Sequence, residues 1–442
     1  MLTTAVTNIT RGLAQSTQPL KATWTRIPAG DIPPRSAHAL VVVDGRAHIF
    51  GGEGTPNDPA GPIDNSMIIC TLPPSSSLSA DIRTVPARSS TSKPEDMPAP
   101  RAGHTAAVIG KNIYIFGGRA PHTHEPLDEK GRVWVFDTRF LQWTPLDPCP
   151  DTPIPPARSH HACTANEHPV PTATDHTTSP VLPDGHTAAL DATHHGTLFI
   201  HAGRTGAPDA PYLNDLWTFD VAARTWSLFP TPPSPARSSP ALVYAQHRLY
   251  RFGGFDGTAS LGAQLDVLHV VVSTFDDKGG KGELAITPRD GDAGAWRVVP
   301  VASGADGAVV PFPSPRSAAG FVPVSTGQGR RYALLLLGER QEDGVFRDDV
   351  WSLQLPPEGM TGASFKDAGR MMVGKDTGEE SWSEAVVVKG DEEEEGVVGR
   401  RPSARGGFAC GAVDVSASEV VLWGGVEADG TVVGDGWLVR VR

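Results

Sequence analysis

Short apolar runs separated by turn residues dominate the stretch between Pro100 and Trp143. Four runs of strand length are found there: His104–Ile109, Ile113–Phe116, Val133–Asp137 and a run around Trp143. They are rich in β-branched and aromatic residues, which favour strands, and no segment between them is long enough for a sizeable helix. The first two runs are separated by a short glycine-containing connection, which is typical of a hairpin. The stretch therefore predicts one four-stranded antiparallel meander.

The same unit recurs along the chain, and the recurrence decides the fold class. Its first strand follows a Pro-Arg or Pro-x-Arg motif, or a degenerate copy of it, with the arginines Arg35, Arg101, Arg158, Arg237, Arg316 and Arg405. Its second strand ends in a glycine motif: Gly51-Gly52, Gly117-Gly118, Ala202-Gly203, Gly253-Gly254, Leu337-Gly338 and Gly424-Gly425. Six copies cover nearly the whole chain.

This combination of motifs resembles the kelch repeat. A WD40 repeat would carry Trp-Asp dipeptides, and the sequence has none. The resemblance implies an all-β fold, a six-bladed kelch-type β-propeller of four-stranded antiparallel blades.

The two ends of the repeat array complement each other. Trp24–Ile27 matches a fourth strand with no blade before it, and the sixth unit ends at Val441 without a fourth strand. We therefore expect the N-terminal strand to join the last blade and close the ring, which leaves no open sheet edge. We predict a disordered tail over 1–20 and a single propeller over 21–442. Its loop insertions are expected at about 73–98, 164–196, 273–295, 356–381 and 389–402.

Charge and composition narrow the classes of partner. The formal net charge of −12 disfavours binding to a phosphate backbone. No apolar run reaches the roughly 20 residues of a membrane span, and the N-terminus lacks the apolar core of a signal peptide. The four cysteines show no CxxC spacing. We expect a monomeric cytoplasmic protein that binds neither nucleic acid nor membranes.

Alternating strand directions assign the loops to faces. The loop that enters the first strand and the loop after the second strand emerge on the same side, so the six repeat arginines should surround one mouth of the central channel. The residues after the glycine motifs should lie near the same mouth: Glu53, Arg119, Arg204, Phe255, Glu339 and Val426.

Two interpretations of the repeat arginines remain open. Each could hydrogen-bond carbonyls or acids of a neighbouring blade, or together they could form an anion-binding pocket. The candidate ligand-binding residues are Arg35, Arg101, Arg158, Arg237, Arg316, Arg405, Glu53, Arg119 and Arg204. Three histidines that follow an arginine by three positions, His38, His104 and His161, should face away from it and are predicted to pack in the interior.

The opening blade, with Gly51-Gly52-Glu53 followed by Pro56, resembles that of the nitrile-specifier and thiocyanate-forming proteins, which are kelch propellers. In that family an iron(II) site uses Glu-x3-Asp-x3-His after the glycines of one blade, and nearby arginines hold the anionic substrate. The resemblance implies Glu339 and Asp343 as metal ligands. Arg347 stands where the histidine ligand would be.

Two functions from different classes follow. The first is a binding scaffold that recognises a protein partner or a small anionic ligand through its loop faces, with no resident cofactor. The alternative is a nitrile-specifier-like, Fe(II)-dependent lyase or another small-molecule transformation in the arginine-lined mouth. A propeller hosts many activities, so the fold does not decide between them.

Overall fold

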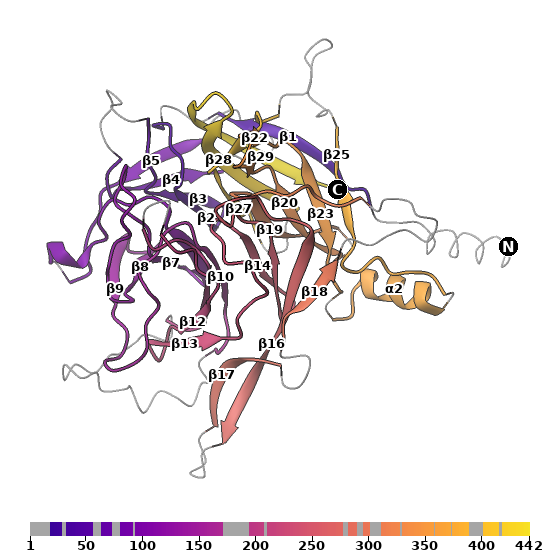
Figure 1. The fold of residues 1–442 in the computed structure, drawn as a ribbon, viewed down its shortest axis with the longest axis horizontal. Coiled ribbons are helices and arrows are strands. Elements are labelled where there is room, and N and C mark those ends of the chain that lie inside the picture. The colour runs from indigo at the N-terminus through magenta and orange to yellow at the C-terminus, as the bar shows by residue number, and fades with distance from the viewer. Residues whose placement is uncertain are drawn as a thin grey trace.

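A computed structural model gives the structure of this chain. It describes residues 18–28, 32–55, 63–72, 80–91, 93–170, 194–206, 210–276, 282–289, 295–300, 311–327, 329–357, 359–372, 374–388, 401–414 and 418–442. The described strands form six radially arranged blades, so the predicted six-bladed β-propeller is confirmed (Figure 1).

Each blade is an antiparallel meander. Blade 1 contains β2 (Ala39–Val43), β3 (Arg46–Phe50), β4 (Met67–Thr71) and β5 (Asp81–Val85), and blade 2 contains β6 (Thr105–Ile109), β7 (Asn112–Phe116), β8 (Val133–Asp137) and β9 (Gln142–Leu146). Blade 3 contains β10 (Ala162–Asn166), β11 (Thr197–His201), β12 (Leu216–Asp220) and β13 (Thr225–Phe229). Blade 4 contains β14 (Ala241–Ala245), β15 (Arg248–Phe252), β16 (Gln264–Asp276), β17 (Gly282–Pro288) and β18 (Arg297–Pro300). Blade 5 contains β19 (Gly320–Ser325), β20 (Arg331–Leu336), β23 (Val350–Gln354) and β24 (Trp382–Glu384). The first strands of neighbouring blades contact one another around the channel.

Blade 6 combines the two ends of the chain. It contains β26 (Arg405–Gly406), β27 (Ala409–Ala412), β28 (Glu419–Glu427), β29 (Val432–Val441) and the N-terminal β1 (Lys21–Ile27). β1 pairs antiparallel with β29, with Trp24 opposite Val439. The predicted closure by the N-terminal strand is therefore confirmed. The predicted tail boundary differs, because Leu20 is only 3% exposed and packs between blades 5 and 6.

The hydrophobic core lies between the blades. Its six clusters of buried residues each combine side chains of two neighbouring blades, including the pair formed by blades 6 and 1. Strands buried on both faces need apolar side chains on both, and β7 and β11 are buried throughout. A blade therefore cannot bury its own faces alone, and the ring is the unit that folds.

Three predicted insertions contain regular structure. In the 273–295 insertion β16 continues to Asp276 and pairs with β17, and this hairpin extends away from the body of the propeller (Figure 1). The 73–98 insertion contains β5 and the 3-10 helix η1 (Pro94–Asp96). The 356–381 insertion forms helix α2 (Gly362–Met372), which is tied to blade 5 by the buried ion pair Arg330–Asp367. Most of 164–196 and all of 389–400 lie outside the described residues.

The segment Trp382–Val388 is divided between two blades. β24 pairs with β23, whereas β25 (Val386–Val387) pairs parallel with β1 of blade 6. This crossing strand joins the two blades at the closure, because the Val386 amide donates to the carbonyl of Leu20.

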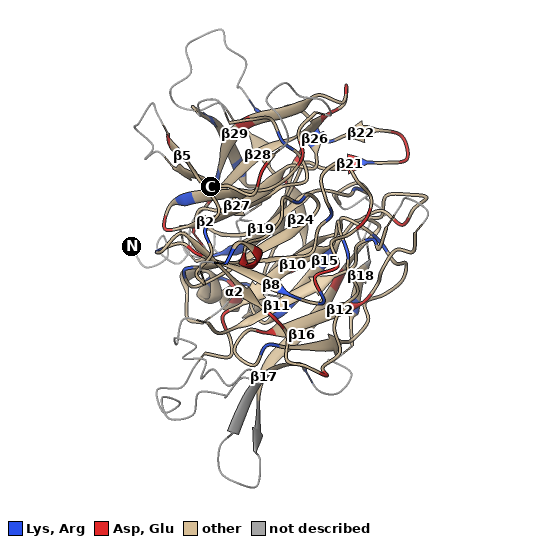
Figure 2. Cartoon of the chain, turned by 90° about the vertical axis from the view of Figure 1, so that its left-hand side faces the viewer, with Lys and Arg blue, Asp and Glu red and all other residues tan. Residues whose placement is uncertain are grey.

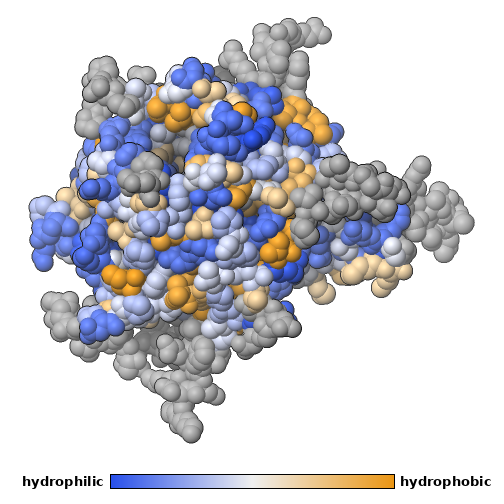
Figure 3. Space-filling view, in the orientation of Figure 1, coloured by the Kyte–Doolittle hydropathy of each residue, from blue (hydrophilic) through white to orange (hydrophobic). Residues whose placement is uncertain are grey.

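Charged residues lie mostly in loops and at strand ends, while the strands are largely neutral (Figure 2). On the face drawn in Figure 3, apolar residues form small groups among hydrophilic ones. No helix in the described part of the chain has the length and apolar character needed to cross a membrane.

Closure of the ring by β1 predicts that Trp24→Ala strongly lowers the free energy of unfolding. This indole is 7% exposed in the cluster between blades 5 and 6, and loss of such an aromatic costs about 3–5 kcal/mol of unfolding free energy. Thr25→Ala, on the exposed side of the same strand, is the matched control. Urea denaturation of both variants measures the difference. Equal midpoints for the two variants would contradict closure by β1.

Candidate functional site

The repeat arginines and glycine motifs form one hydrogen-bond network. In every blade the arginine Nε donates to the carbonyl two residues earlier in the chain. Its Nη1 donates to the carbonyl of the first residue of that blade's glycine motif, over 2.9–3.2 Å. The arginine's own carbonyl accepts from the second glycine of the preceding blade. Since Gly425 of blade 6 donates to Arg35 of blade 1, the network is a closed ring.

The second glycine of each motif cannot be replaced without strain. These six glycines have φ between 95° and 110°, a conformation that side chains rarely adopt. At Gly52 an added Cβ would lie 2.7 Å from the Cβ of His38 and from the carbonyl oxygen of Ser36. The glycine motif therefore lets two loops of one blade approach closely while its amide reaches the next blade.

Four of the six arginines also bind a carboxylate of their own blade. The pairs are Arg101–Glu129, Arg158–Asp215, Arg316–Asp349 and Arg405–Asp435. In each pair the carboxylate also accepts from an indole N–H, that of Trp134, Trp217, Trp351 or Trp437. These acids are not among the residues predicted above, although the repeated Asp-x-Trp of blades 3, 5 and 6 is a sequence signal for three of them.

Arg35 and Arg237 have no carboxylate within ion-pair distance among the described residues. Burial lowers the pKa of Arg35 to about 10, against the raising effect of Asp64. Burial, reinforced by the charge of Arg251, lowers the pKa of Arg237 to about 9.

The repeat arginines are 0–3% exposed, and their donors are turned into the blades. This geometry matches the interpretation in which each arginine hydrogen-bonds carbonyls or acids, but the prediction that these belong to a neighbouring blade differs from the structure. The side chain stays within its own blade, and the backbone carbonyl makes the link between blades. None of the six is among the residues that line the central cavity. An anion-binding role for them stays a prediction.

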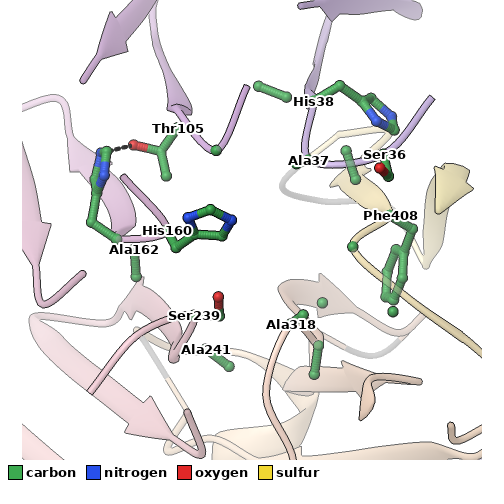
Figure 4. A pocket seen from close by; sticks show the side chains of 18 of the residues that line it. Ser36, Ala37, His38, Thr105, His160, Ala162, Ser239, Ala241, Ala318 and Phe408 are labelled. Carbon is green, nitrogen blue, oxygen red and sulfur yellow. Dashed lines mark hydrogen bonds between the residues drawn. The ribbon is translucent and has the colours of Figure 1, made fainter. Parts of the chain in front are cut away.

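The central cavity, called the cup below, has a volume of about 440 Å³. All six blades contribute to its wall through the residues two and three positions after each repeat arginine. Glu53, Arg204, Glu339, Gln341 and Val426 add to the lining. Figure 4 shows Ala37, Ser239 and Ala318 around the cavity, with the His160 imidazole extending toward its middle.

In each blade the loop that enters the first strand lies beside the loop after the second strand, as predicted. The residue after the arginine pairs through its backbone with the residue after the glycine motif. The pairs are Ser36–Glu53, Ala102–Arg119, Ser159–Arg204, Ser238–Phe255, Ser317–Glu339 and Gly406–Val426. The structure thus places Glu53, Arg119 and Arg204 at equivalent positions of blades 1, 2 and 3.

Glu53 and Arg119 neutralise each other across blades 1 and 2. Arg119 Nη1 donates to Glu53 Oε2 over 2.9 Å, and the backbone amide of His122 donates to the same oxygen. Burial raises the pKa of Glu53, but the bonds from Arg119 and His122 outweigh it, so its pKa lies below the ordinary value.

Arg204 and Glu339 have no charged partner among the described residues. The Arg204 guanidinium makes no side-chain hydrogen bond there, and its Nε is buried without an acceptor. The Glu339 carboxylate accepts only from the Gln341 side-chain amide, over 2.9 Å, and burial raises its pKa. The cup therefore presents one unpaired cation and one unpaired acid.

His38, His104 and His161 pack in the interior, as predicted, with 4–5% exposure. His104 makes an edge contact with Phe50, with ring centroids 5.5 Å apart, and the equivalent contact in the next blade joins His161 to Phe116. His161 Nε2 also bonds Thr105 Oγ1 over 2.7 Å (Figure 4).

The implied iron ligands do not form a metal site. Glu339 accepts from Gln341, whereas Asp343 is paired with Arg340. No cluster of three or more His, Cys, Asp or Glu within the described ranges could hold a metal ion. The donor set therefore does not fit Fe(II).

Comparisons with known proteins agree with the fold. The family model described as the KLHDC2/KLHL20/DRC7 Kelch-repeats domain matches residues 17–170. The solved structure of YjhT is 12% identical with a TM-score of 0.50, covers 94% of this chain and 99% of its own, and at that identity supports the fold alone. The fold is a six-bladed β-propeller, and over residues 17–170 the chain is similar to the kelch repeat.

Curated proteins to which the chain is similar include two from Homo sapiens. Kelch domain-containing protein 3 of Homo sapiens is 26% identical over 175 residues, which is 37% of each chain. Host cell factor 1 of Homo sapiens is 28% identical over 243 residues, which is 52% of this chain and 10% of that protein. The match thus spans about a third of the first relative and a tenth of the second. The nitrile-specifier resemblance stays a hypothesis.

The arginine ring predicts that Arg101→Met destabilises the fold. The substitution keeps most of the side-chain volume but removes the guanidinium that bonds the Glu129 carboxylate and two carbonyls, at a cost of about 3–5 kcal/mol. Lys111→Met removes an exposed ion pair and should cost about 0–1 kcal/mol. Thermal melts compare the two. An unchanged melt for Arg101→Met, with sulfate binding lost, would instead assign Arg101 to an anion site.

The buried histidines predict loss of stability in mild acid. Burial, then the charge of Arg101, lowers the pKa of His104 to about 3, while the unfolded chain takes up that proton near pH 6.5. Stability is therefore complete above pH 6.5 and falls toward pH 3, by about 1.4 kcal/mol per pH unit for each such group. Urea midpoints at pH 7, 6 and 5 should fall less steeply for His104→Gln. The exposed His124→Gln should follow the wild type, and parallel slopes for all three proteins would contradict the assignment.

Proposed function

We propose that this protein is a kelch-repeat scaffold that binds a segment of a partner protein in the cup. The observation that carries the proposal is Arg204, a guanidinium that lines the cup with no acceptor among the described residues. An incoming acidic group would supply the missing acceptor, with the fixed donor geometry that arginine offers to carboxylates.

The architecture supports recognition by a preformed surface. The cup wall consists of loops held by the arginine ring, so little ordering entropy is lost when a ligand binds. A volume of about 440 Å³ suits a few side chains or a small molecule. The similarity to kelch-repeat proteins favours a protein-binding scaffold, and the net charge of −12 is consistent with a partner other than nucleic acid. In this proposal the protein acts as a cytoplasmic monomer.

A displayed library of random 12-residue peptides, selected on the immobilised full-length chain, tests the proposal. Recovered peptides should contain an acidic residue and should bind Arg204→Met about ten- to a hundredfold more weakly by fluorescence anisotropy. Lys111→Met, with an exposed substitution, should bind like the wild type. The melting temperature of Arg204→Met should stay unchanged, because the Arg204 side chain has no hydrogen-bonded partner among the residues that the structure describes.

Two results would overturn this function. One is the absence of any enriched peptide; the other is equal affinity of enriched peptides for wild type and Arg204→Met. If sulfate or a small carboxylate alone binds with Arg204-dependent affinity while no peptide does, the ligand is a small anion and the scaffold proposal fails.

A further inference from the structure

Besides Arg204 in blade 3, the cup has a second charge without a charged partner among the described residues. It is Glu339, which lies in blade 5. Its carboxylate lines the cup and rests against Gly406, where an added Cβ would lie 2.8 Å from Oε2. Its one side-chain hydrogen-bond partner in the described part of the chain is the neutral amide of Gln341. A carboxylate that is partly removed from water without a cation is unfavourable, so a donor or cation brought by a ligand would stabilise it.

The nearest basic residue in the chain does not provide this cation. Arg340 follows Glu339 directly, but its guanidinium is paired with Glu342 at 3.2 Å and with Asp343 at 3.1 Å. The hairpin that carries these acids, β21 (Glu339–Arg340) with β22 (Val345–Phe346), is fixed to blade 4. There the backbone amide of Ser260 donates to the Glu342 carboxylate, and the backbone amide of Gln341 donates to Ser260 Oγ. Arg340 is thus held away from Glu339 by contacts of its own.

The order of equivalent positions around the cup sets a pattern for its occupant. Arg204 stands in blade 3, Phe255 in blade 4 and Glu339 in blade 5, each directly after its glycine motif. Phe255 makes an edge contact with Tyr212, with ring centroids 6.3 Å apart. Of these three residues Arg204 and Glu339 line the cup, so a cation and an acid face it from blades 3 and 5.

We propose that the cup selects a partner segment with two opposite charges, an acidic side chain that meets Arg204 and a basic side chain, Lys or Arg, that meets Glu339. This inference rests on the proposed function and adds the basic residue. It also agrees with the net charge of −12, since an acidic protein attracts a basic partner over a distance. The two charges of the segment meet blades 3 and 5, with blade 4 between them.

The peptides recovered on the full-length chain provide the probe. They should share a Lys or Arg, and replacing it by Met should weaken binding to the wild type about ten- to a hundredfold. Glu339→Gln is nearly isosteric and should weaken the parent peptide by a similar factor. On that variant the Lys→Met change in the peptide should cost almost nothing more, because the interaction it removes is already absent. Asp343→Asn, on the same hairpin, is the matched control and should bind the parent peptide like the wild type.

The outcomes separate the two proposals. Peptides that depend on Arg204 but lack a common basic residue, or that bind Glu339→Gln as tightly as the wild type, overturn the charge pairing and leave the scaffold in place. Additive losses from Glu339→Gln and from the peptide change also overturn it. An Arg204-independent set of peptides overturns the scaffold proposal itself. Melting temperatures of Glu339→Gln and the wild type should agree, and a fall would assign Glu339 to the fold instead.

Discussion

The ring of bonds between each repeat arginine and the glycine of the preceding blade is the constraint on which the structure depends. Each arginine acts twice: its guanidinium closes its own blade, and its carbonyl accepts from the blade before. A second circle lies inside this ring, at the residues two positions after each arginine, which all have positive φ. Five of the six amides there donate to the neighbouring blade, as Gly103 does to Ala37. These bonds fix the angle between blades, and the apolar clusters between blades supply most of the free energy.

Blade 4 shows how far a repeat can depart from the pattern while this ring is kept. Near the end of β15 it has Arg251 opposite Asp266 of β16, where blades 2 and 3 have an Ile opposite a Trp. Both side chains are at most 1% exposed and bonded to each other at 2.7 Å. Arg251 also donates to Asn214 Oδ1 and to the Pro233 carbonyl, so the buried charge is fully satisfied. An ion pair of this kind adds less stability than a packed Ile–Trp pair, but it penalises any other register of the two strands.

Sequence reasoning succeeded where a physical requirement repeats and failed where it occurs once. The glycine motifs and arginines recur because six loops need the same geometry, and the unpaired Trp24 strand followed from counting strands. Helix α2 was missed because its sequence has two glycines and exposes Phe365 at 67%, which hides any apolar period. The sequence did not determine whether the repeat arginines are buried. A charged residue near the mouth can face the channel or its own blade, and its orientation depends on which carbonyls and acids lie within reach. The neutralisation of Glu53 by Arg119 depends on a contact between blades that no local pattern encodes.

The same ring explains why the cup can vary without cost to the fold. The residue after each glycine motif contributes its backbone to the pairing with the residue after the arginine, and this pairing is the same in all six blades. Its side chain is not needed for that pairing, and the six blades place Glu, Arg, Arg, Phe, Glu and Val there. Four of these six residues, Glu53, Arg204, Glu339 and Val426, line the cup. Two of the six compensate each other, and Arg204 and Glu339 do not, so the asymmetry of the cup is where the recognition chemistry of this propeller should be sought.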